Sequence, residues 1–332
     1  MTRRAIALIL CLLAAVNTVF GQLLYEADDG VGNINQITPS GTVTQFSNVI
    51  GMSARGIEFD TSGNLYTASI NGTVSIVAPD GSVSTLASGL HIAEGLAIDS
   101  SGNVYVSIRN GGVNDWIDKI TPGGVVTTFA SGFNNPGGLV FDSSGNLFLA
   151  DSGNGVIDKI TPSGVVSFFA TAGGYGLTID SNGNLFLATG GVSVDEITSA
   201  GVVSTFATGM TDTNFLAFDS SGNLFVSDDS GEIYKVTSGG IVSPFVAVPE
   251  PFGLAFRPAP EPGTIALLLS GLGWIGLAVR RKRVSIFLTK PLSLANQHDA
   301  TVLAVKGLRC APMNARRALD TSGRPHRTHV LG

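Results

Sequence analysis

Five segments of the chain carry an aspartate and an asparagine at one fixed spacing, and such oxygen-bearing loops could hold a hard cation. They are Asp60-Thr-Ser-Gly-Asn64, Asp99-Ser-Ser-Gly-Asn103, Asp142-Ser-Ser-Gly-Asn146, Asp180-Ser-Asn-Gly-Asn184 and Asp219-Ser-Ser-Gly-Asn223. Each loop offers a single carboxylate, whereas an EF-hand calcium loop needs several acids and a distal Glu. Asp and Asn also close turns by bonding to nearby backbone, and Gly supplies the left-handed position. We therefore expect structural turns.

Acid–base or nucleophilic catalysis would need a positioned group with a suitable pKa. Residues 22–258 contain a single histidine, His91, and nothing in its neighbourhood indicates a Ser-His-Asp arrangement. The remaining histidines, His298, His326 and His329, fall in the C-terminal tail. The sequence thus leaves enzymatic activity open but favours a protein without it.

The aspartate segments mark a repeat of 38 to 43 residues. One unit reads as strands over 139–141, 147–150, 156–160 and 165–170, separated by turns, and no helical period interrupts this pattern. Four short strands in about 40 residues are typical of a β-propeller blade. Full units begin near Gly56, Gly95, Gly138, Gly176 and Phe215.

The two remaining pieces complement each other. Residues 23–46 supply three strands and residues 253–256 supply the missing first strand, so together they make a sixth blade. We therefore predict an all-β, six-bladed propeller of four-stranded antiparallel blades over 22–258. Its first blade would be closed by strands from both ends, which removes exposed sheet edges.

Ligands of propellers usually bind at the mouth of the central channel, and the residue before each blade's first strand should line it. These residues are Arg55, Glu94, Gly137, Tyr175, Asn214 and Phe252. Their variety contrasts with the regular repeat. Arg55 and Tyr175 are therefore candidate ligand contacts.

The blades resemble NHL repeats and the six-bladed propellers of the regucalcin/gluconolactonase and streptogramin-lyase groups, over about 235 residues. In gluconolactonase-like propellers, Glu, Asn and Asp side chains hold a metal at the channel mouth. By this resemblance Glu94, Asn135, Asp151, Asn214 and Asp228 would be the candidate ligands. The match is partial, so no cofactor is expected, with Ca²⁺ or Mg²⁺ as the alternative. The streptogramin-lyase group uses a histidine with a neighbouring Glu and Mg²⁺, and the propeller region here has one histidine, His91, and no second.

One unit is longer than the others because of the loop from Arg109 to Asp115, and Trp116 follows it directly. A long loop beside an aromatic side chain could contact a glycan or a protein partner. The alternative is that Trp116 packs between blades. Trp116 joins Tyr175 and Arg55 as a candidate ligand contact.

Residues 1–21 read as a secretory signal peptide. Arg3 and Arg4 precede an apolar run from Ala5 to Val16, and a small residue precedes a cut before Gln22. The alternative is an uncleaved anchor helix. The signal predicts that the chain from residue 22 onward is exported.

The C-terminal part carries three features in a fixed order. Pro260, Glu261 and Pro262 begin a short polar motif (260–264), an apolar run follows (265–279), and Arg280, Arg281, Lys282 and Arg283 close it. The positive-inside rule keeps this basic cluster in the cytoplasm. The alternative is an ordinary C-terminal anchor.

This arrangement over 259–283 resembles the PEP-CTERM sorting signal of Gram-negative bacteria. The resemblance implies transient anchoring in the inner membrane, cleavage by an exosortase-type protease, and delivery to the cell surface or matrix of an exopolysaccharide-producing, biofilm-forming bacterium. The 49 residues of 284–332 go beyond this pattern. They are basic, and we expect a disordered tail or an artefact of the gene's 3′ end.

Charge excludes one class of partner. Residues 22–263 hold 23 acidic and 6 basic residues, a net charge of −17. Nucleic acids bind through Lys and Arg against phosphate, so an acidic ring would repel them. The sequence as a whole predicts a surface-sorted, non-catalytic propeller that binds an extracellular glycan or protein. The alternative is a metal-dependent lactonase or hydrolase of the gluconolactonase type.

Overall fold

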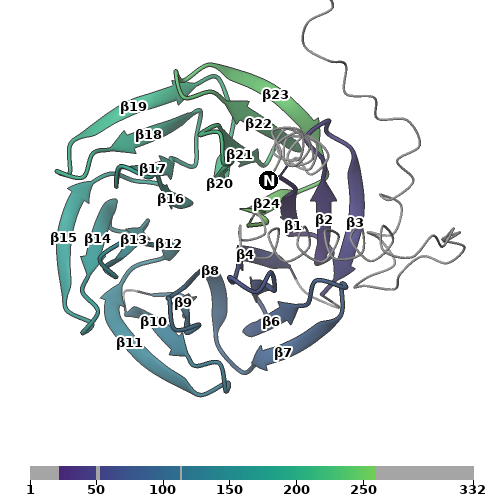
Figure 1. Cartoon of the computed structure of the whole chain (residues 1–332). Coiled ribbons are helices and arrows are strands. Elements are labelled where there is room, and N and C mark those ends of the chain that lie inside the picture. Colours follow the sequence, from purple (N-terminus) through teal and green to yellow (C-terminus); the bar gives the residue numbers. More distant parts are fainter. Residues whose placement is uncertain (1–21, 50–52, 113, 259–332) are drawn as a thin grey trace, which may run out of the picture. The chain divides into compact units, whose positions relative to one another are not determined.

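The repeat units fold into six four-stranded antiparallel sheets arranged as blades around a central axis (Figure 1). The structure, a computed structural model, describes residues 22–49, 53–112 and 114–258. The predicted signal peptide (1–21), sorting signal (259–283) and tail (284–332) lie outside the described residues. Within the described ranges, no helix is long and apolar enough to cross a membrane.

The strands follow the chain from blade to blade. Blade 1 contains β24 (Pro251–Phe256), β1 (Leu24–Asp28), β2 (Asn33–Ile37) and β3 (Val43–Asn48). Blade 2 contains β4 (Ala54–Phe59), β5 (Leu65–Ser69), β6 (Thr73–Val77) and β7 (Val83–Ala87). Blade 3 contains β8 (Ile92–Ile98), β9 (Val104–Arg109), β10 (Asp115–Ile120) and β11 (Val126–Phe133). Blade 4 contains β12 (Pro136–Phe141), β13 (Leu147–Asp151), β14 (Val156–Ile160) and β15 (Val166–Thr171). Blade 5 contains β16 (Leu177–Ile179), β17 (Leu185–Ala188), β18 (Ser193–Ile197) and β19 (Val203–Thr208). Blade 6 contains β20 (Thr213–Phe218), β21 (Leu224–Asp228), β22 (Glu232–Val236) and β23 (Val242–Ala247).

The ring closes as the sequence predicts, through a blade assembled from both ends of the propeller. Strand β24 pairs antiparallel with β1, with Phe256 opposite Leu24 and Leu254 opposite Glu26. The Arg257 amide also donates a hydrogen bond to the Leu23 carbonyl at 3.1 Å. The prediction of an all-β, six-bladed propeller is confirmed. Its closure ties the two ends of the ring together and leaves no innermost strand without a neighbour.

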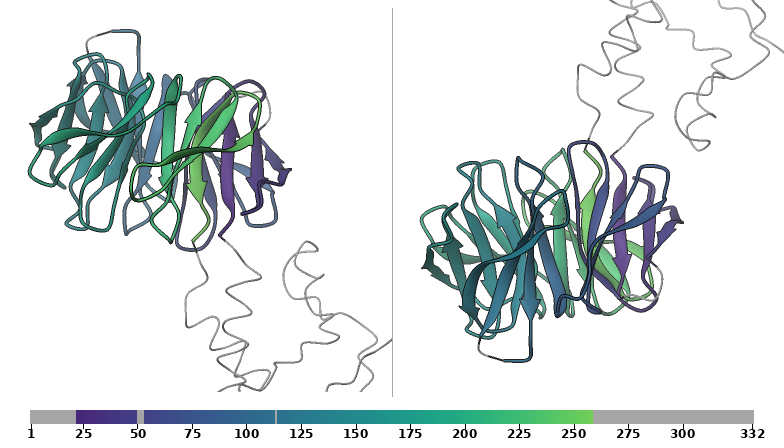
Figure 2. Two further views of the ribbon diagram at one scale, coloured as in Figure 1. Left: turned by 90° about the horizontal axis from the view of Figure 1, so that it is seen from above. Right: turned by 90° about the horizontal axis from the view of Figure 1, so that it is seen from below.

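The ring has two distinct faces, which we call the mouth face and the turn face (Figure 2). The first and third strands of each blade run toward the turn face, and the second and fourth return to the mouth face. Asp28, at the end of β1, therefore lies on the mouth face. Leu23 and Arg257, at the opposite ends of β1 and β24, lie on the turn face. The chain thus enters and leaves the propeller on the face opposite the mouth.

The five aspartate segments form the tight turns between the first and second strands, on the turn face. In the first of them, Asp60 Oδ1 accepts hydrogen bonds from the amides of Ser62 and Asn64, each at 2.8 Å. Its Oδ2 accepts the Asn64 side-chain amide at 2.8 Å. Gly63 occupies the left-handed region at φ 83°, as the turn requires. Both carboxylate oxygens are bound within the turn itself.

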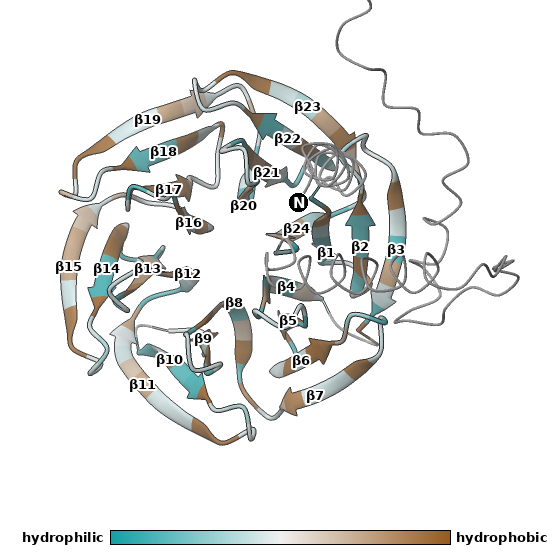
Figure 3. Cartoon of the chain, viewed as in Figure 1, coloured by the Kyte–Doolittle hydropathy of each residue, from teal (hydrophilic) through white to brown (hydrophobic). Residues whose placement is uncertain are grey.

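The core lies between neighbouring blades. Tyr25 of β1 contacts Phe46 of its own blade and Phe59 of blade 2 edge to face, with ring centroids 5.1 and 4.9 Å apart. Blades 3, 5 and 6 repeat this trio with their own aromatic residues. The outermost strands carry both hydrophobic and hydrophilic residues (Figure 3), and each of those in blades 2, 4 and 5 has exposed residues before a buried alanine near its end.

Glycine on the innermost strands lets the blades approach closely around the axis. A Cβ atom on Gly56 would lie 2.6 Å from the Glu94 carbonyl oxygen, and one on Gly95 would lie 2.5 Å from the Gly137 carbonyl oxygen. Both neighbours are backbone atoms that cannot swing away. This packing brings Arg55, next to Gly56, and Glu94, next to Gly95, together at the mouth of the channel.

Candidate functional site

Charged and aromatic side chains from four blades meet at the mouth of the channel. Arg55 comes from β4, Glu94 from β8 and Arg109 from the end of β9. Tyr175 precedes β16, and Asp29 follows β1. We call these five residues the channel-mouth network. The sequence predicted Arg55, Glu94 and Tyr175 at the mouth, and the structure brings these three together.

Glu94 is fully buried and is held by two guanidinium groups. Arg55 Nη1 donates to both carboxylate oxygens, at 3.0 Å to Oε1 and 2.8 Å to Oε2. Arg109 Nη1 donates to Oε1 at 2.6 Å. A buried carboxylate is stable only when its charge is paired in this way, because burial without a partner carries a large desolvation cost.

Arg55 also pairs outward with a more exposed acid. Its Nε and Nη2 atoms donate to Asp29 Oδ1 and Oδ2, each at 3.1 Å. Burial lowers the pKa of Arg55, but the charge and hydrogen bond of Glu94 more than offset this and hold the pKa above its ordinary value. The guanidinium therefore stays charged between its two carboxylate partners.

Aromatic rings lie beside these charges. The Tyr175 ring lies edge to face with Phe215 at 5.9 Å and with Phe252 at 6.0 Å between centroids. The Arg55 guanidinium carbon lies 4.8 Å from the Phe252 ring centroid, a cation–π contact. Burial, and then the nearby charge of Glu94, raises the pKa of Tyr175. Its phenol is thus kept protonated beside the Glu94 carboxylate.

The donor set around Glu94 does not fit a divalent cation. Calcium binds carboxylate oxygens at about 2.3–2.6 Å, but both Glu94 oxygens already accept N–H groups at 3.0 Å or less. The two guanidinium groups would also repel a second positive ion at that distance. Among the described residues, no group of three or more His, Cys, Asp or Glu side chains is placed to hold a metal. The cation site implied by resemblance stays a prediction that this geometry does not support.

Asp151 and Asn135, two other predicted ligands, hold a loop on the mouth face. Asp151 Oδ1 accepts the Asn134 amide at 2.8 Å, and its Oδ2 accepts the Asn154 side chain at 2.7 Å. The Asn135 amide donates to Asp115 Oδ2 at 2.9 Å, and Asn135 itself takes a left-handed backbone at φ 55°. The structure shows no hydrogen bond from either predicted ligand to Glu94.

Asp228 and Asn214 are likewise engaged within blade 6. The Asp228 carboxylate accepts hydrogen bonds from the amides of Thr211, Asp212 and Ser230 at 2.7 to 3.0 Å, and from the Thr211 hydroxyl at 2.5 Å. Asn214 donates its side-chain amide to Asp229. These hydrogen bonds lower the pKa of Asp228 to about 2, although burial acts in the opposite direction. The second strands of blades 1, 4 and 6 thus end in aspartates that hold neighbouring loops.

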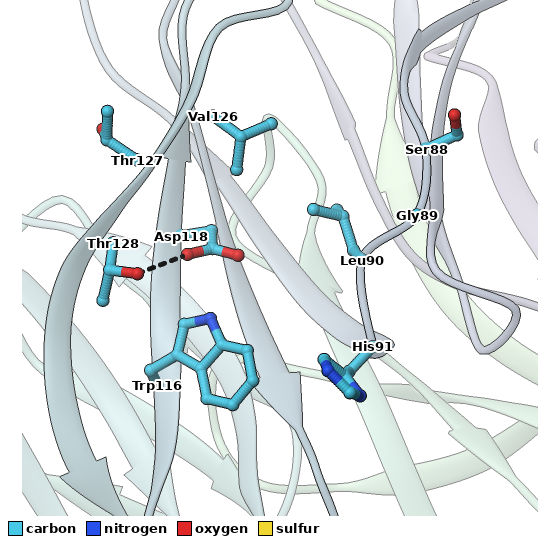
Figure 4. A pocket seen from close by; sticks show the side chains of 9 residues that line it. All are labelled: Ser88, Gly89, Leu90, His91, Trp116, Asp118, Val126, Thr127 and Thr128. Atoms are coloured by element: carbon cyan, nitrogen blue, oxygen red, sulfur yellow. Dashed lines mark hydrogen bonds between the residues drawn. The ribbon is translucent and has the colours of Figure 1, made fainter.

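Trp116 lies away from the channel, in a groove between blades 2 and 3. The groove is lined by the connection from β7 to β8 and by residues of β10 and β11 (Figure 4). Trp116 is half-buried and packs against the core shared by these two blades. The expected interblade packing and an accessible ring surface therefore occur together.

Sequence reasoning missed Arg109 and Asp29 as members of the network. Arg109 stands one residue past the position of Asp28 and Asp228, where blades 1 and 6 have Asp29 and Asp229. That reversal of charge at one position of the repeat was a readable signal. Asp29 directly follows Asp28, whose carboxylate accepts hydrogen bonds from the amides of the loop after β1. Nothing in the local sequence distinguishes the role of Asp29 from that of Asp28.

Comparisons with known proteins agree with both the fold and the C-terminal signal. Residues 258–283 match the model of the PEP-CTERM protein-sorting motif. No curated protein sequence matches the chain.

Solved structures share the ring. A protein of unknown function from Bacteroides caccae superimposes with a TM-score of 0.59 at 14% identity, covering 72% of this chain and 99% of the other. A catalytically inactive virginiamycin B lyase from Staphylococcus aureus, with quinupristin, gives 0.53 at 17% identity, covering 71% and 92%. A gluconolactonase from Xanthomonas campestris gives 0.55 at 17% identity, covering 62% and 79%. At these identities the likeness is one of fold. The chain is a six-bladed propeller that carries a PEP-CTERM sorting motif.

Proposed function

We propose that this protein is an exported, surface-displayed propeller that binds an extracellular matrix component without transforming it. The PEP-CTERM motif implies export, processing by an exosortase and sorting to the surface. The observation that carries the non-catalytic part is the pairing of Glu94 with Arg55 and Arg109. This pairing commits the central carboxylate to a structural role at the place where propellers bind their ligands.

The place where the chain leaves the propeller is compatible with display of the propeller on the cell surface. Arg257 leaves β24 on the turn face, next to Leu23, and the sorting motif begins at residue 258. While the apolar run 265–279 anchors the chain in the inner membrane, the turn face would be the attached side. The mouth face and the sides of the ring would stay accessible to matrix polymers.

Sorting can be tested in a bacterium that has an exosortase, using an antibody against the propeller. We expect the full-length chain to be shortened and to reach the surface. A double variant, Pro260→Ala with Pro262→Ala, should stay full-length in the inner membrane. Pro258→Ala, next to the motif core, is the matched control and should sort normally. Normal processing of the double variant would contradict the proposed sorting route.

The binding role is tested with the purified full-length protein in mild detergent. We expect it to sediment with extracellular polymer harvested from the producing cells, and to be released by an excess of the soluble fraction of that polymer. Failure to bind any matrix fraction, with sorting intact, would leave surface display standing and remove the binding role.

The gluconolactonase alternative draws on the shared fold and on Glu94 at the mouth. It predicts hydrolysis of aldonolactones that depends on Ca²⁺ or Mg²⁺, and stabilisation of the folded protein by the ion. A ligand at a hundredfold excess over its Kd stabilises a protein by about 2.7 kcal/mol. We expect neither hydrolysis nor an upward shift of Tm against EDTA. Turnover of an aldonolactone that requires Ca²⁺ or Mg²⁺ would make the lactonase the better proposal.

A further inference from the structure

The groove between blades 2 and 3 collects side chains that could recognise a ligand. It has a volume of about 360 Å³, within the range of about 300–1,000 Å³ typical of small-ligand sites. Leu90 and His91 form one wall, and Trp116, Asp118, Val126 and Thr128 form the other (Figure 4). The first wall belongs to the connection from β7 of blade 2 to β8 of blade 3, and the second belongs to β10 and β11 of blade 3.

The repeat is altered at this groove. Blade 4 keeps an aspartate on its third strand but has Val156 in place of Trp116 and Phe168 in place of Thr128. The connection that follows blade 3 has Asn134 in place of His91. Trp116 and His91 therefore replace a valine and an asparagine of the neighbouring unit, and both line one groove.

Blade 5 shows what the unmodified position looks like. Asp195 pairs with Thr205 across β18 and β19, as Asp118 pairs with Thr128 across β10 and β11. Two residues before Asp195, however, stands Ser193, where blade 3 has Trp116. The aspartate–threonine pair thus recurs in blade 5, and blade 3 adds the indole to it.

The groove side chains are already positioned for a ligand. Asp118 is only 6% exposed, and Thr128 Oγ1 donates to its Oδ1 at 3.2 Å. Its other oxygen points away from Thr128 into the groove (Figure 4). His91 contacts the indole edge to face, with ring centroids 5.4 Å apart and an angle of 82° between the rings. A half-buried indole, a fixed carboxylate oxygen and an exposed imidazole thus border the same space.

We propose that this groove binds a sugar ring of a neutral polysaccharide. The C–H face of the ring would stack on Trp116, as apolar groups do on aromatic faces. Hydroxyl groups of the sugar would donate charge-assisted hydrogen bonds to the Asp118 oxygen that faces the groove. His91 would contact the sugar ring from the opposite wall.

Charge selects the class of polysaccharide. The block from 22 to 263 carries a net charge of −17, and Asp118 brings a carboxylate to the groove itself. A polyanion such as a polyuronate would be repelled from both. The inference rests on the proposed function, since it names the matrix component that the displayed propeller would bind and where it would bind.

The test uses the full-length protein in detergent and affinity gel electrophoresis. The gels would contain dextran, a soluble β-glucan, a galactomannan or alginate. We expect the wild type to be retarded by at least one neutral polymer and not by alginate. Trp116→Val introduces the residue that blade 4 already carries at this position, so the blade should still fold. It should raise the apparent dissociation constant obtained from the retardation at least tenfold, and Asp118→Asn should raise this constant by a similar factor.

Asp195→Asn is the matched control, because it alters the same strand position in blade 5 and should leave retardation unchanged. Circular dichroism melting confirms that each variant is folded. Equal retardation of wild type and folded Trp116→Val would overturn the groove while leaving a binding propeller in place. Retardation by alginate alone, or binding only to proteins of the matrix, would overturn the neutral-glycan assignment. Absence of any binding, with sorting intact, would overturn both this inference and the proposed binding role.

Discussion

A single nitrogen of Arg55, Nη1, donates to both oxygens of Glu94, at 3.0 and 2.8 Å, where the innermost strands of blades 2 and 3 meet. The carboxylate is fully buried, and the Arg55 side chain is 20% exposed. The pair therefore joins two neighbouring blades at the axis, in a ring whose remaining charge is strongly acidic. It also removes from the channel mouth the carboxylate that a metal would need.

Replacing Glu94 tests how much the network stabilises the ring. Glu94→Gln keeps the shape but leaves two guanidinium groups facing a neutral amide. Removing one partner of a buried ion pair costs about 3–5 kcal/mol, and we expect a loss of that order in the free energy of unfolding, measured by urea titration. Asp29→Asn, which breaks only the more exposed pair, should cost about 1 kcal/mol or less. Equal effects of the two variants would contradict a buried, structural Glu94.

Asp228 should behave as a brace of its loop and show a defined pH dependence. Its folded pKa of about 2 lies below the ordinary value of 3.8. The carboxylate therefore stabilises the fold at pH values above about 4, and this stability is lost as the pH falls toward 2. Asp228→Ala, which leaves buried donors without acceptors, should lower the free energy of unfolding at pH 7 by about 1–3 kcal/mol.

The control for this prediction is Asp212→Asn, which alters an exposed neighbour and keeps the amide that bonds Asp228. Its unfolding curve should overlay that of the wild type. If Asp228→Ala were equally stable at pH 7, or if its deficit failed to shrink between pH 4 and pH 2, the brace would be refuted.

Glu26 should give the opposite pH dependence. It is fully buried in β1, with Oε2 bonded to Asn35 at 2.8 Å and Oε1 without a partner among the described residues. Burial raises its pKa from 4.5 to about 8. The folded state then holds the proton that the unfolded state releases, so stability is fully present below about pH 4.5 and falls as the pH rises toward 8.

The slope expected from Glu26 between pH 5 and 8 is at most about 1.4 kcal/mol per pH unit. Glu26→Gln, a neutral isostere, should reduce the slope to the part that Glu58 produces, since burial raises the pKa of Glu58 to about 8 as well, and should make the protein more stable than the wild type at pH 8. Denaturant titrations at several pH values measure it. The half-buried Glu232→Gln should keep the wild-type slope. A slope as steep in Glu26→Gln as in the wild type would contradict the contribution of Glu26.

The ring could be predicted from sequence because the evidence for it is local and repeated. The Asp142 to Asn146 turn and the hydrophobic pattern around it predicted strands over 139–141, 147–150, 156–160 and 165–170. All four strands form, each within three residues of its predicted bounds. The number of blades followed from complementary fragments at the two ends. Each blade must bury both faces against neighbours, so a closed ring was the consistent arrangement.

The side-chain partners at the mouth could not be predicted in the same way. The position of Glu94 was predictable from the repeat, but its partners lie 39 residues before it and 15 after it, in different strands. Which charged groups meet there depends on the spacing of the blades and on the ends of second strands, and neither is encoded locally. The sequence predicted Trp116 as a candidate ligand contact or as a residue packed between blades, but it did not predict the groove, because His91 comes from the separate connection between β7 and β8.

The close approach of the inner strands yields a further prediction at Gly95. An added Cβ would lie 2.5 Å from the Gly137 carbonyl oxygen and 2.9 Å from the Gly138 Cα, both backbone atoms of blade 4. Gly95→Ala must therefore push blades 3 and 4 apart, and overpacking of this kind costs about 1–3 kcal/mol. Gly123→Ala is the matched control within blade 3, since its nearest neighbour lies at 3.8 Å, and it should stay within about 0.5 kcal/mol of the wild type. Chemical denaturation compares the two, and a Gly95→Ala protein as stable as the control would mean that the axis is less tightly packed than the structure shows.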